Sequence, residues 1–442
     1  MSSLESGSAF DETSERGEQR RASRPSAPRR WTPPATVHRA GVIALGLLAA
    51  SAVVAACASA DETLGTVPTD DAGGGGDGAP DAIESDAADA GSDSTIAAKD
   101  ACSSAGWCAT DVDPKLSFDD LWPLPGGAAV AVASRDGRSA VLLYERSKWN
   151  VIHEVPFVLT SIWADTANIW IAGADPGYVA HGRLQSNNGI NPEYTWTAHP
   201  LPVQTPVAVV RGTEEQEVYA LADTRVWRLP EDGGGWEVDY GGDAPASETT
   251  FSSLSGTSKG DLWLTGVRGI FPPCAVVAHK TGGAWVTVID GTVVDPWAWP
   301  PACEAPEGAV PWVAYPEIAT STAPNELVTF AEGVDGYYIV ARMRHLADGG
   351  LDIAHHNIPT QPQIPLRDRR AIWGASADDL YMAGYSKVNR GRNLWADGGG
   401  WEISTVSFEG LPLSKQFHVV RGTRSDDVWV AGESYVFHKT ID

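Results

Sequence analysis

The chain has 442 residues, 43% of them hydrophobic, so it is long enough to bury a large core. Its 57 Asp and Glu residues outnumber its 32 Lys and Arg residues, which gives a formal net charge of −25. Nucleic acids and anionic lipids are bound by surfaces rich in Lys and Arg, so this charge disfavours both, and we expect no nucleic-acid partner.

The N-terminal region has the composition of a targeting segment. Residues 1–36 mix Arg and Glu with Ser and Pro and are predicted to be disordered. An apolar run at 41–55 follows, with Arg29, Arg30 and Arg39 on its N-terminal side, which is typical of a bacterial export signal. The first 36 residues are too long and too charged for an ordinary signal. We therefore expect them not to be translated, with translation starting at Val37.

The apolar run ends in the sequence Val54-Ala55-Ala56-Cys57. This ending resembles the lipobox of bacterial lipoproteins, which implies that Cys57 is lipidated and becomes the mature N-terminus. The alternative is an uncleaved membrane anchor with an incidental cysteine. In both cases the arginines hold the N-terminal side in the cytoplasm, so the rest of the chain is expected in the cell envelope, at the outer membrane or cell surface.

Residues 58–100 consist mainly of Ala, Gly and Asp, with eleven acidic residues and one Lys. Such a segment has almost nothing to bury and a high net charge, so it is predicted to be a disordered tether. A lipid on Cys57 would then hold a domain at 101–442 off a membrane surface.

From 118 to 432 the chain repeats one phrase seven times: an apolar pair, a small-residue turn, an acidic residue, and an apolar run that ends in a small residue. The clearest copies are 253–266, 372–384 and 419–432. The anchor residues of the seven copies are Ala131, Trp170, Tyr219, Trp263, Val328, Tyr381 and Trp429. Their spacings of 39 to 65 residues suit four-stranded blades, so we predict an all-β, seven-bladed β-propeller.

Fourteen of the 18 tryptophans fall in register within these repeats. We expect Trp395 on a third strand and Trp236 on a fourth, and most of the rings should fill the gaps between neighbouring blades. The seventh repeat stops before its fourth strand, whereas Trp107 lies in an isolated strand-like segment before the first repeat. One blade would then be built from both ends of the domain, which favours a closed ring over an open solenoid.

The acidic turn residues recur once per blade, for example Asp261, Asp379 and Asp427. Residues a blade apart cannot converge on one calcium ion, so we expect Asx-type turns and no metal site. With Cys57 used for lipid, four cysteines remain, and an even number suits disulfides in an oxidising compartment. Of the three possible connectivities we prefer Cys102 with Cys108 and Cys274 with Cys303.

A proline- and tryptophan-rich insertion at 295–317 lies between the fourth and fifth anchors. Cys303 would pin this insertion to one face of the ring, where it would form an aromatic platform or simply cover the blade beneath it. The candidate ligand-binding residues on this face are Trp297, Trp299, Trp312, Tyr337, Tyr338, Tyr385, Arg390 and Arg392.

The sequence contains no nucleophile elbow, zinc-protease motif, phosphate loop or paired-cysteine ligand set, so we expect no catalytic centre and no cofactor. The repeats, such as Ile372-Trp373-Gly374-Ala375-Ser376, resemble the W-G-x-S-x-x-D-V-W-A-V-G units of secreted bacterial β-propeller lipoproteins. That resemblance implies the fold and no particular reaction.

The function predicted is a membrane-tethered module that binds extracellular or periplasmic protein or carbohydrate. One alternative is a polysaccharide hydrolase or lyase that uses acids such as Asp295, Glu332 or Asp335. The other is a purely structural component of the envelope.

Overall fold

The computed structural model describes residues 102–187, 192–213, 216–231, 234–241, 249–269, 274–295, 302–304, 318–332, 338–358, 371–404, 406–408 and 411–440. All of them belong to the unit Ser92–Asp442. The predicted segments 1–36, 37–57 and 58–100, and with them Cys57, lie outside the described residues.

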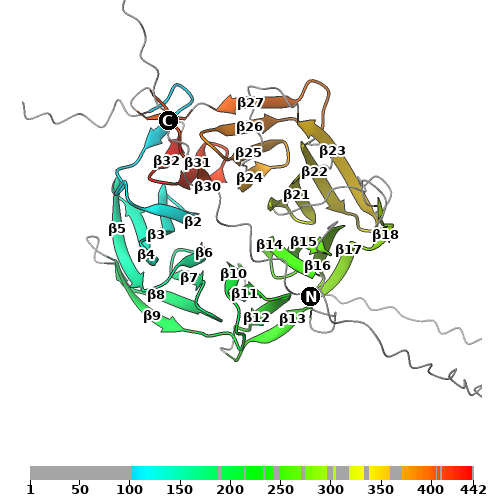
Figure 1. The fold of residues 1–442 in the computed structure, drawn as a ribbon, viewed down its shortest axis with the longest axis horizontal. Helices are drawn as coiled ribbons and strands as arrows, with labels where there is room; N and C mark the ends of the chain where they lie inside the picture. The colour runs from blue at the N-terminus through cyan, green and yellow to red at the C-terminus, as the bar shows by residue number, and fades with distance from the viewer. Residues whose placement is uncertain are drawn as a thin grey trace, which may run out of the picture. The chain divides into compact units, whose positions relative to one another are not determined.

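The described residues form seven four-stranded antiparallel sheets, which we call blades 1 to 7 (Figure 1). From the innermost to the outermost strand, blades 1 to 3 comprise β2 (Ser117–Leu124), β3 (Ala128–Arg135), β4 (Arg138–Glu145) and β5 (Lys148–Val155); β6 (Leu159–Ala164), β7 (Asn168–Gly173), β8 (Val179–Asn187) and β9 (Pro192–Ala198); β10 (Val207–Gly212), β11 (Val218–Ala222), β12 (Arg225–Leu229) and β13 (Glu237–Tyr240).

Blades 4 to 6 follow the same order: β14 (Thr249–Ser258), β15 (Asp261–Arg268), β16 (Cys274–Thr281) and β17 (Ala284–Ile289); β20 (Ile318–Ala323), β21 (Glu326–Glu332), β22 (Tyr338–His345) and β23 (Leu351–Ile358); β24 (Ala371–Ser376), β25 (Asp379–Ala383), β26 (Val388–Arg392) and β27 (Gly400–Ser404). Blade 7 comprises β30 (Phe417–Arg424), β31 (Asp427–Gly432), β32 (Val436–Thr440) and β1 (Trp107–Ala109). Two short hairpins, β18 (Val293–Asp295) with β19 (Ala302–Cys303) and β28 (Ser407–Phe408) with β29 (Leu411–Pro412), lie between blades.

The seven blades close into a ring. The first strand of each blade packs against the first strand of the next, from β2 through β6, β10, β14, β20 and β24 to β30, and β30 in turn packs against β2 (Figure 1). The protein is therefore a seven-bladed β-propeller, as the repeat predicts.

The core lies between neighbouring blades and is centred on the second strands. Every residue of Asp427–Gly432 and of Val218–Ala222 is buried, whereas most residues of the fourth strands in blades 1 to 6 are exposed or half-buried. A hydrophobic cluster around Trp170 and Val210, for example, draws its residues from blades 2 and 3. An apolar run bounded by small residues thus becomes a strand covered on both faces.

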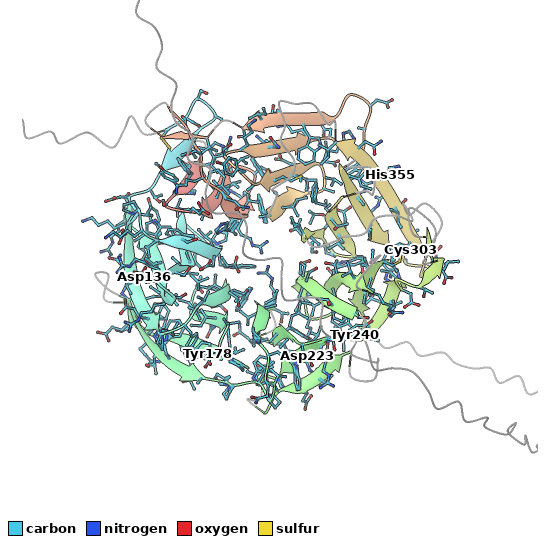
Figure 2. The ribbon with its side chains drawn as sticks, in the orientation of Figure 1. Asp136, Tyr178, Asp223, Tyr240, Cys303 and His355 are labelled. Carbon is cyan, nitrogen blue, oxygen red and sulfur yellow. A yellow bond between two sulfur atoms is a disulfide. The ribbon has the colours of Figure 1, made fainter. Side chains whose placement is uncertain are left out.

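The ring is closed by the strand from the N-terminal side, as predicted. Trp107 pairs with Lys439 and Cys108 with His438 in the antiparallel ladder between β1 and β32. Trp107 is fully buried, and its indole Nε1 donates a hydrogen bond to Ser404 Oγ in blade 6 at 2.8 Å. Both predicted disulfides are present, Cys102–Cys108 at this strand and Cys274–Cys303 at blade 4 (Figure 2).

Pairs of second- and third-strand residues recur around the ring. His279 stacks on Trp263 and His438 on Trp429, with ring centroids 4.0 and 3.8 Å apart. The Nε2 of His279 lies 2.8 Å from Asp261 Oδ1. We call these sets of an aromatic ring, a third-strand His or Arg, and an acid the interblade triads.

The prediction of Asx-type turns was wrong in detail. Asp261 and Asp427 contact the third-strand histidines of their own blades instead, His438 Nε2 lying 2.7 Å from Asp427 Oδ1. Asp261 also accepts a hydrogen bond from the backbone N–H of Asn325 in the next blade, at 3.1 Å.

Three details of the predicted register are also corrected. In blade 1 the anchor residue of the second strand is Val130 instead of Ala131. Val130 pairs with Trp122, which is the first-strand residue equivalent to those that pair with the other six anchors. Trp395 follows the third strand Val388–Arg392 and lies in the turn after it. Trp236 immediately precedes β13 instead of lying within it.

Candidate functional site

One position on each first strand lies opposite the second-strand anchor, and together these seven positions surround the centre of the ring. We call them the channel positions. From blade 1 to blade 7 they are Trp122, Trp163, Arg211, Ser255, Thr320, Trp373 and Arg421.

Six of these residues, all except Trp163, line one cavity of about 250 Å³, which we call the channel cavity. Its other lining residues, among them Ser321 and Thr423, follow the channel positions by one or two residues. The cavity therefore lies toward the face that carries the turns between first and second strands. That face is opposite the one where successive blades are joined and where the insertion at 295–317 begins.

Arg211 is the most buried cation of the cavity, with 7% of its surface exposed. Its Nε donates a hydrogen bond to the carbonyl oxygen of Leu254 at 3.2 Å, while its Nη1 is buried and has no partner among the described residues. The guanidinium carbon lies 4.6 Å from the centroid of the Trp122 ring, a distance typical of a cation–π contact.

Arg421 occupies the same position in blade 7. Its guanidinium carbon lies 5.9 Å from the Trp122 ring centroid, and its Nε is likewise buried with no partner among the described residues. The Ser255 hydroxyl, on the same cavity wall, is a third buried polar atom without a described partner. Buried polar groups are normally hydrogen-bonded, so three such atoms around one cavity indicate a place where a ligand supplies the partners.

The two arginines raise each other's cost of burial. Burial, and then the charge of Arg421, lowers the pKa of Arg211 to about 9, whereas the charge of Asp120 acts in the opposite direction. Even at that value the Arg211 guanidinium is cationic at neutral pH.

Asp120 does not neutralise these cations by direct pairing. Its Oδ1 accepts a hydrogen bond from the Leu121 N–H at 2.9 Å. Its Oδ2 accepts from the Ser161 hydroxyl at 3.2 Å and from the Ile162 N–H at 3.0 Å. These bonds tie blade 1 to blade 2 and leave Arg211 Nη1 and Arg421 Nε without a described partner.

The residue after each channel arginine must be glycine. A Cβ on Gly422 would lie 2.6 Å from a ring carbon of Trp373, and a Cβ on Gly212 would collide with the ring of Trp163. The pentapeptide Val-Val-Arg-Gly-Thr, present at 209–213 and at 419–423, thus presents a cation and receives the tryptophan of the preceding blade.

Some of the sequence-predicted site residues occupy structural positions. Arg390 was expected in a loop, but it lies within β26 and is 9% exposed. Its Nε and Nη2 donate to Asp379 Oδ1 and Oδ2, each at 2.7 Å, and its guanidinium lies over Tyr381. It is thus the cation of an interblade triad. Arg392 ends the same strand, at the face opposite the predicted one, and pairs with Glu402 at 3.5 Å.

Of the predicted aromatic residues, Tyr385 is 48% exposed and lies between β25 and β26, on the face that was predicted. Tyr338 begins β22. Trp297, Trp299, Trp312 and Tyr337 lie outside the described residues, as does Asp335. The strands place Asp295 and Glu332 at the ends of β18 and β21.

The channel residues were missed by the sequence analysis, although a signal was present. The same five residues occur in two repeats that otherwise differ, and they carry an arginine where three other blades have tryptophan. The outer strands of blades 1 and 2 line a second hollow of about 440 Å³, but it contains no arginine, and His355 lies at the rim of blade 5 (Figure 2).

Within the described ranges no group of three or more His, Cys, Asp or Glu side chains is arranged to hold a metal ion. The same part of the chain contains no helix with the length and hydropathy needed to cross a membrane.

No protein-family model matches this chain, and no curated protein matches it. Solved structures match in fold. A catalytically inactive virginiamycin B lyase from Staphylococcus aureus, crystallised with quinupristin, is 13% identical with a TM-score of 0.49, over 76% of this chain and 99% of that chain. The computationally designed Ika8 protein is 11% identical with a TM-score of 0.45, over 75% of this chain and 98% of its own.

PorZ, a surface component of the type-IX secretion system of Porphyromonas gingivalis, is 10% identical with a TM-score of 0.46, over 71% of this chain and 45% of PorZ. Likeness at these levels carries no argument about ligand or activity. The propeller assignment stands on the strand pairing of this chain.

Proposed function

We propose that this protein is a binding module of the cell envelope: a β-propeller held outside the cytoplasm by a lipid on Cys57, whose ring binds a protein or carbohydrate ligand. The observation that carries the binding role is the channel cavity, where Arg211, Arg421 and Ser255 each keep a buried polar atom without a described partner. Such atoms are costly unless a ligand satisfies them.

The composition of the cavity wall favours binding over catalysis. The residues that line it are Trp, Pro, Arg, Ser, Gly and Thr, with neither a carboxylate nor an imidazole among those described. General acid–base hydrolysis of a polysaccharide needs such groups within hydrogen-bond reach of the substrate. The channel cavity therefore gives no support to the hydrolase alternative.

The extracytoplasmic location is supported by the two disulfides, because structural disulfides persist in oxidising compartments. The lipid anchor rests on the lipobox-like ending at Cys57. Metabolic labelling with an alkyne fatty acid tests it: the full-length protein should incorporate label, and Cys57→Ser should not. Equal labelling of both proteins would contradict the anchor.

Binding is tested with the full-length protein in detergent, on a glycan array and in pull-downs from envelope extracts. Two double variants are compared with the wild type: Arg211→Gln/Arg421→Gln in the channel and Trp297→Ala/Trp299→Ala in the insertion. We expect the channel variant to lose the captured ligand. Loss in the insertion variant alone would move the site to the other face, and no capture by the wild type would contradict a binding role.

A further inference from the structure

We propose that the channel cavity binds an acidic sugar, with the carboxylate held between Arg211 and Arg421 and the sugar hydroxyls held by the ring of serines and threonines around them. This inference rests on the proposed binding function and names the class of ligand for it.

The charge of the cavity sets the first requirement. Two guanidinium groups lie against one Trp122 ring, at 4.6 and 5.9 Å from its centroid, and the neighbouring Asp120 is occupied by three hydrogen bonds of its own. Two like charges held together at a largely buried site are stabilised by an anion between them. Because guanidinium donors are coplanar and forked, a carboxylate matches them in geometry.

Beyond the arginines, the cavity wall carries hydroxyls. Ser255, Thr320, Ser321 and Thr423 line the same space. The Ser321 hydroxyl donates to the Ala323 carbonyl oxygen at 3.3 Å and the Thr423 hydroxyl to Asp427 Oδ2, so both can still accept, whereas the Ser255 hydroxyl is buried without a described partner. A hydroxyl can both donate and accept, as the hydroxyls of a sugar require. A simple carboxylate such as acetate would leave the Ser255 hydroxyl without a partner.

The size of the cavity sets the third requirement. At about 250 Å³ it is smaller than the roughly 300–1,000 Å³ of pockets for drug-sized ligands, so it suits a single ring. The first-strand tryptophans Trp122 and Trp373 add apolar area to the wall. A hexuronate residue combines the carboxylate, the hydroxyls and this size.

The test is calorimetric titration of the full-length protein in detergent with sodium glucuronate, glucose and sodium acetate. We expect glucuronate to bind at least about tenfold more tightly than either glucose or acetate, because only glucuronate has both kinds of group. Its affinity should fall as salt is raised, since the contact is ionic.

Substitutions at the cavity wall test which side chains contact glucuronate. Arg211→Gln and Arg421→Gln should each weaken glucuronate binding by about tenfold or more, and Ser255→Ala by a smaller factor. Arg344→Gln, which removes an arginine paired with Asp352 on the outer strands of blade 5, should leave the affinity unchanged. Thermal unfolding of each variant checks that it is folded.

Three results would overturn the proposal: glucose binding as tightly as glucuronate, acetate binding as tightly as glucuronate, or unchanged affinity in both arginine variants. If a peptide with a free C-terminal carboxylate binds and glucuronate does not, the acidic-sugar ligand is wrong and the binding module stands. If no ligand is captured on the array or in the pull-down either, the proposed function fails as well.

Discussion

Arg390 and Arg211 are both at least nine-tenths buried, yet they have opposite surroundings. Arg390, on a third strand, forms two hydrogen bonds to Asp379 and lies over Tyr381. Arg211, on a first strand, also lies over an aromatic ring but keeps Nη1 without a described partner. A cation in this ring is structural where the repeat supplies an acid across the sheet and open to a ligand where it does not.

The repeat explains the difference. In blades 4, 6 and 7 the second strand begins with an acid that lies opposite the end of the third strand: Asp261 pairs in register with Thr281, Asp379 with Arg392 and Asp427 with Thr440. The acid therefore contacts the third-strand Arg or His that lies two residues before that end. The channel positions of the first strands surround the ring centre, and none of the seven is an acid.

The largest expected effect is on the interblade triads. Trp429→Ala removes a ring that is 1% exposed and stacked on His438, so we expect a loss of about 3–5 kcal/mol in the free energy of unfolding. Chemical denaturation followed by tryptophan fluorescence measures it. Trp122→Ala, at a half-buried channel position, should cost less stability; equal losses would remove the distinction between the two regions.

Breaking the paired arginine comes next. Arg390→Met leaves the Asp379 carboxylate largely buried without its cation, which should cost about 3 kcal/mol. The double variant Arg390→Met/Asp379→Leu should recover much of that loss in the same denaturation experiment, because both charges are gone. A double variant no more stable than Arg390→Met would show that the ion pair is not what the arginine provides.

Acid should weaken the contact of His181, which stacks on Trp170 and bonds to Asn168 in blade 2, before it affects the channel. Burial, followed by the charges of His199 and Arg183, lowers the pKa of His181 from 6.5 to about 4. The unfolded chain then binds this proton more tightly, so stability is complete above about pH 6.5 and falls as the pH drops toward 4. Unfolding midpoints between pH 7 and pH 4 measure this, and His181→Gln should flatten the slope. An unchanged slope in that variant would assign the acid sensitivity to other groups.

The smallest effect is expected from Arg211→Met. It removes a buried charge that has no acid partner, and it loses the bond from Nε to Leu254 and the cation–π contact with Trp122, which the methionine side chain replaces in part, so the free energy of unfolding should stay within about 1 kcal/mol of the wild type. The same denaturation series provides the value. A loss as large as that of Arg390→Met would mean that the channel arginine is itself a structural partner.

The fold could be predicted because each blade carries its own local pattern. The apolar pair, the turn and the anchor residue recur in every copy, and the missing fourth strand after Val436–Thr440 points to Trp107. Both disulfides follow from the same register, since they join segments that the propeller brings together.

The sequence does not locate the channel positions as directly as it locates the blades. Five first strands carry a bulge ahead of the channel position, for example between Leu159 and Ser161 and between Val207 and Val209. A bulge shifts the alternation by one residue, so a first-strand residue expected to face a neighbouring blade faces the centre instead. For this reason the alternation of the sequence alone does not show that Arg211 and Arg421 face the centre.

The disulfide at the closing strand also determines how the ring bears a pull from its N-terminal side. Tension applied ahead of Cys102 would pass through the sulfur–sulfur bond to Cys108, which sits in the middle of the ladder opposite His438. The intervening segment, with Trp107 anchored to Ser404, would carry none of that force. A repeated pull from the N-terminal side would therefore load the β1–β32 ladder at its middle residue and would not peel β1 away from its N-terminal end.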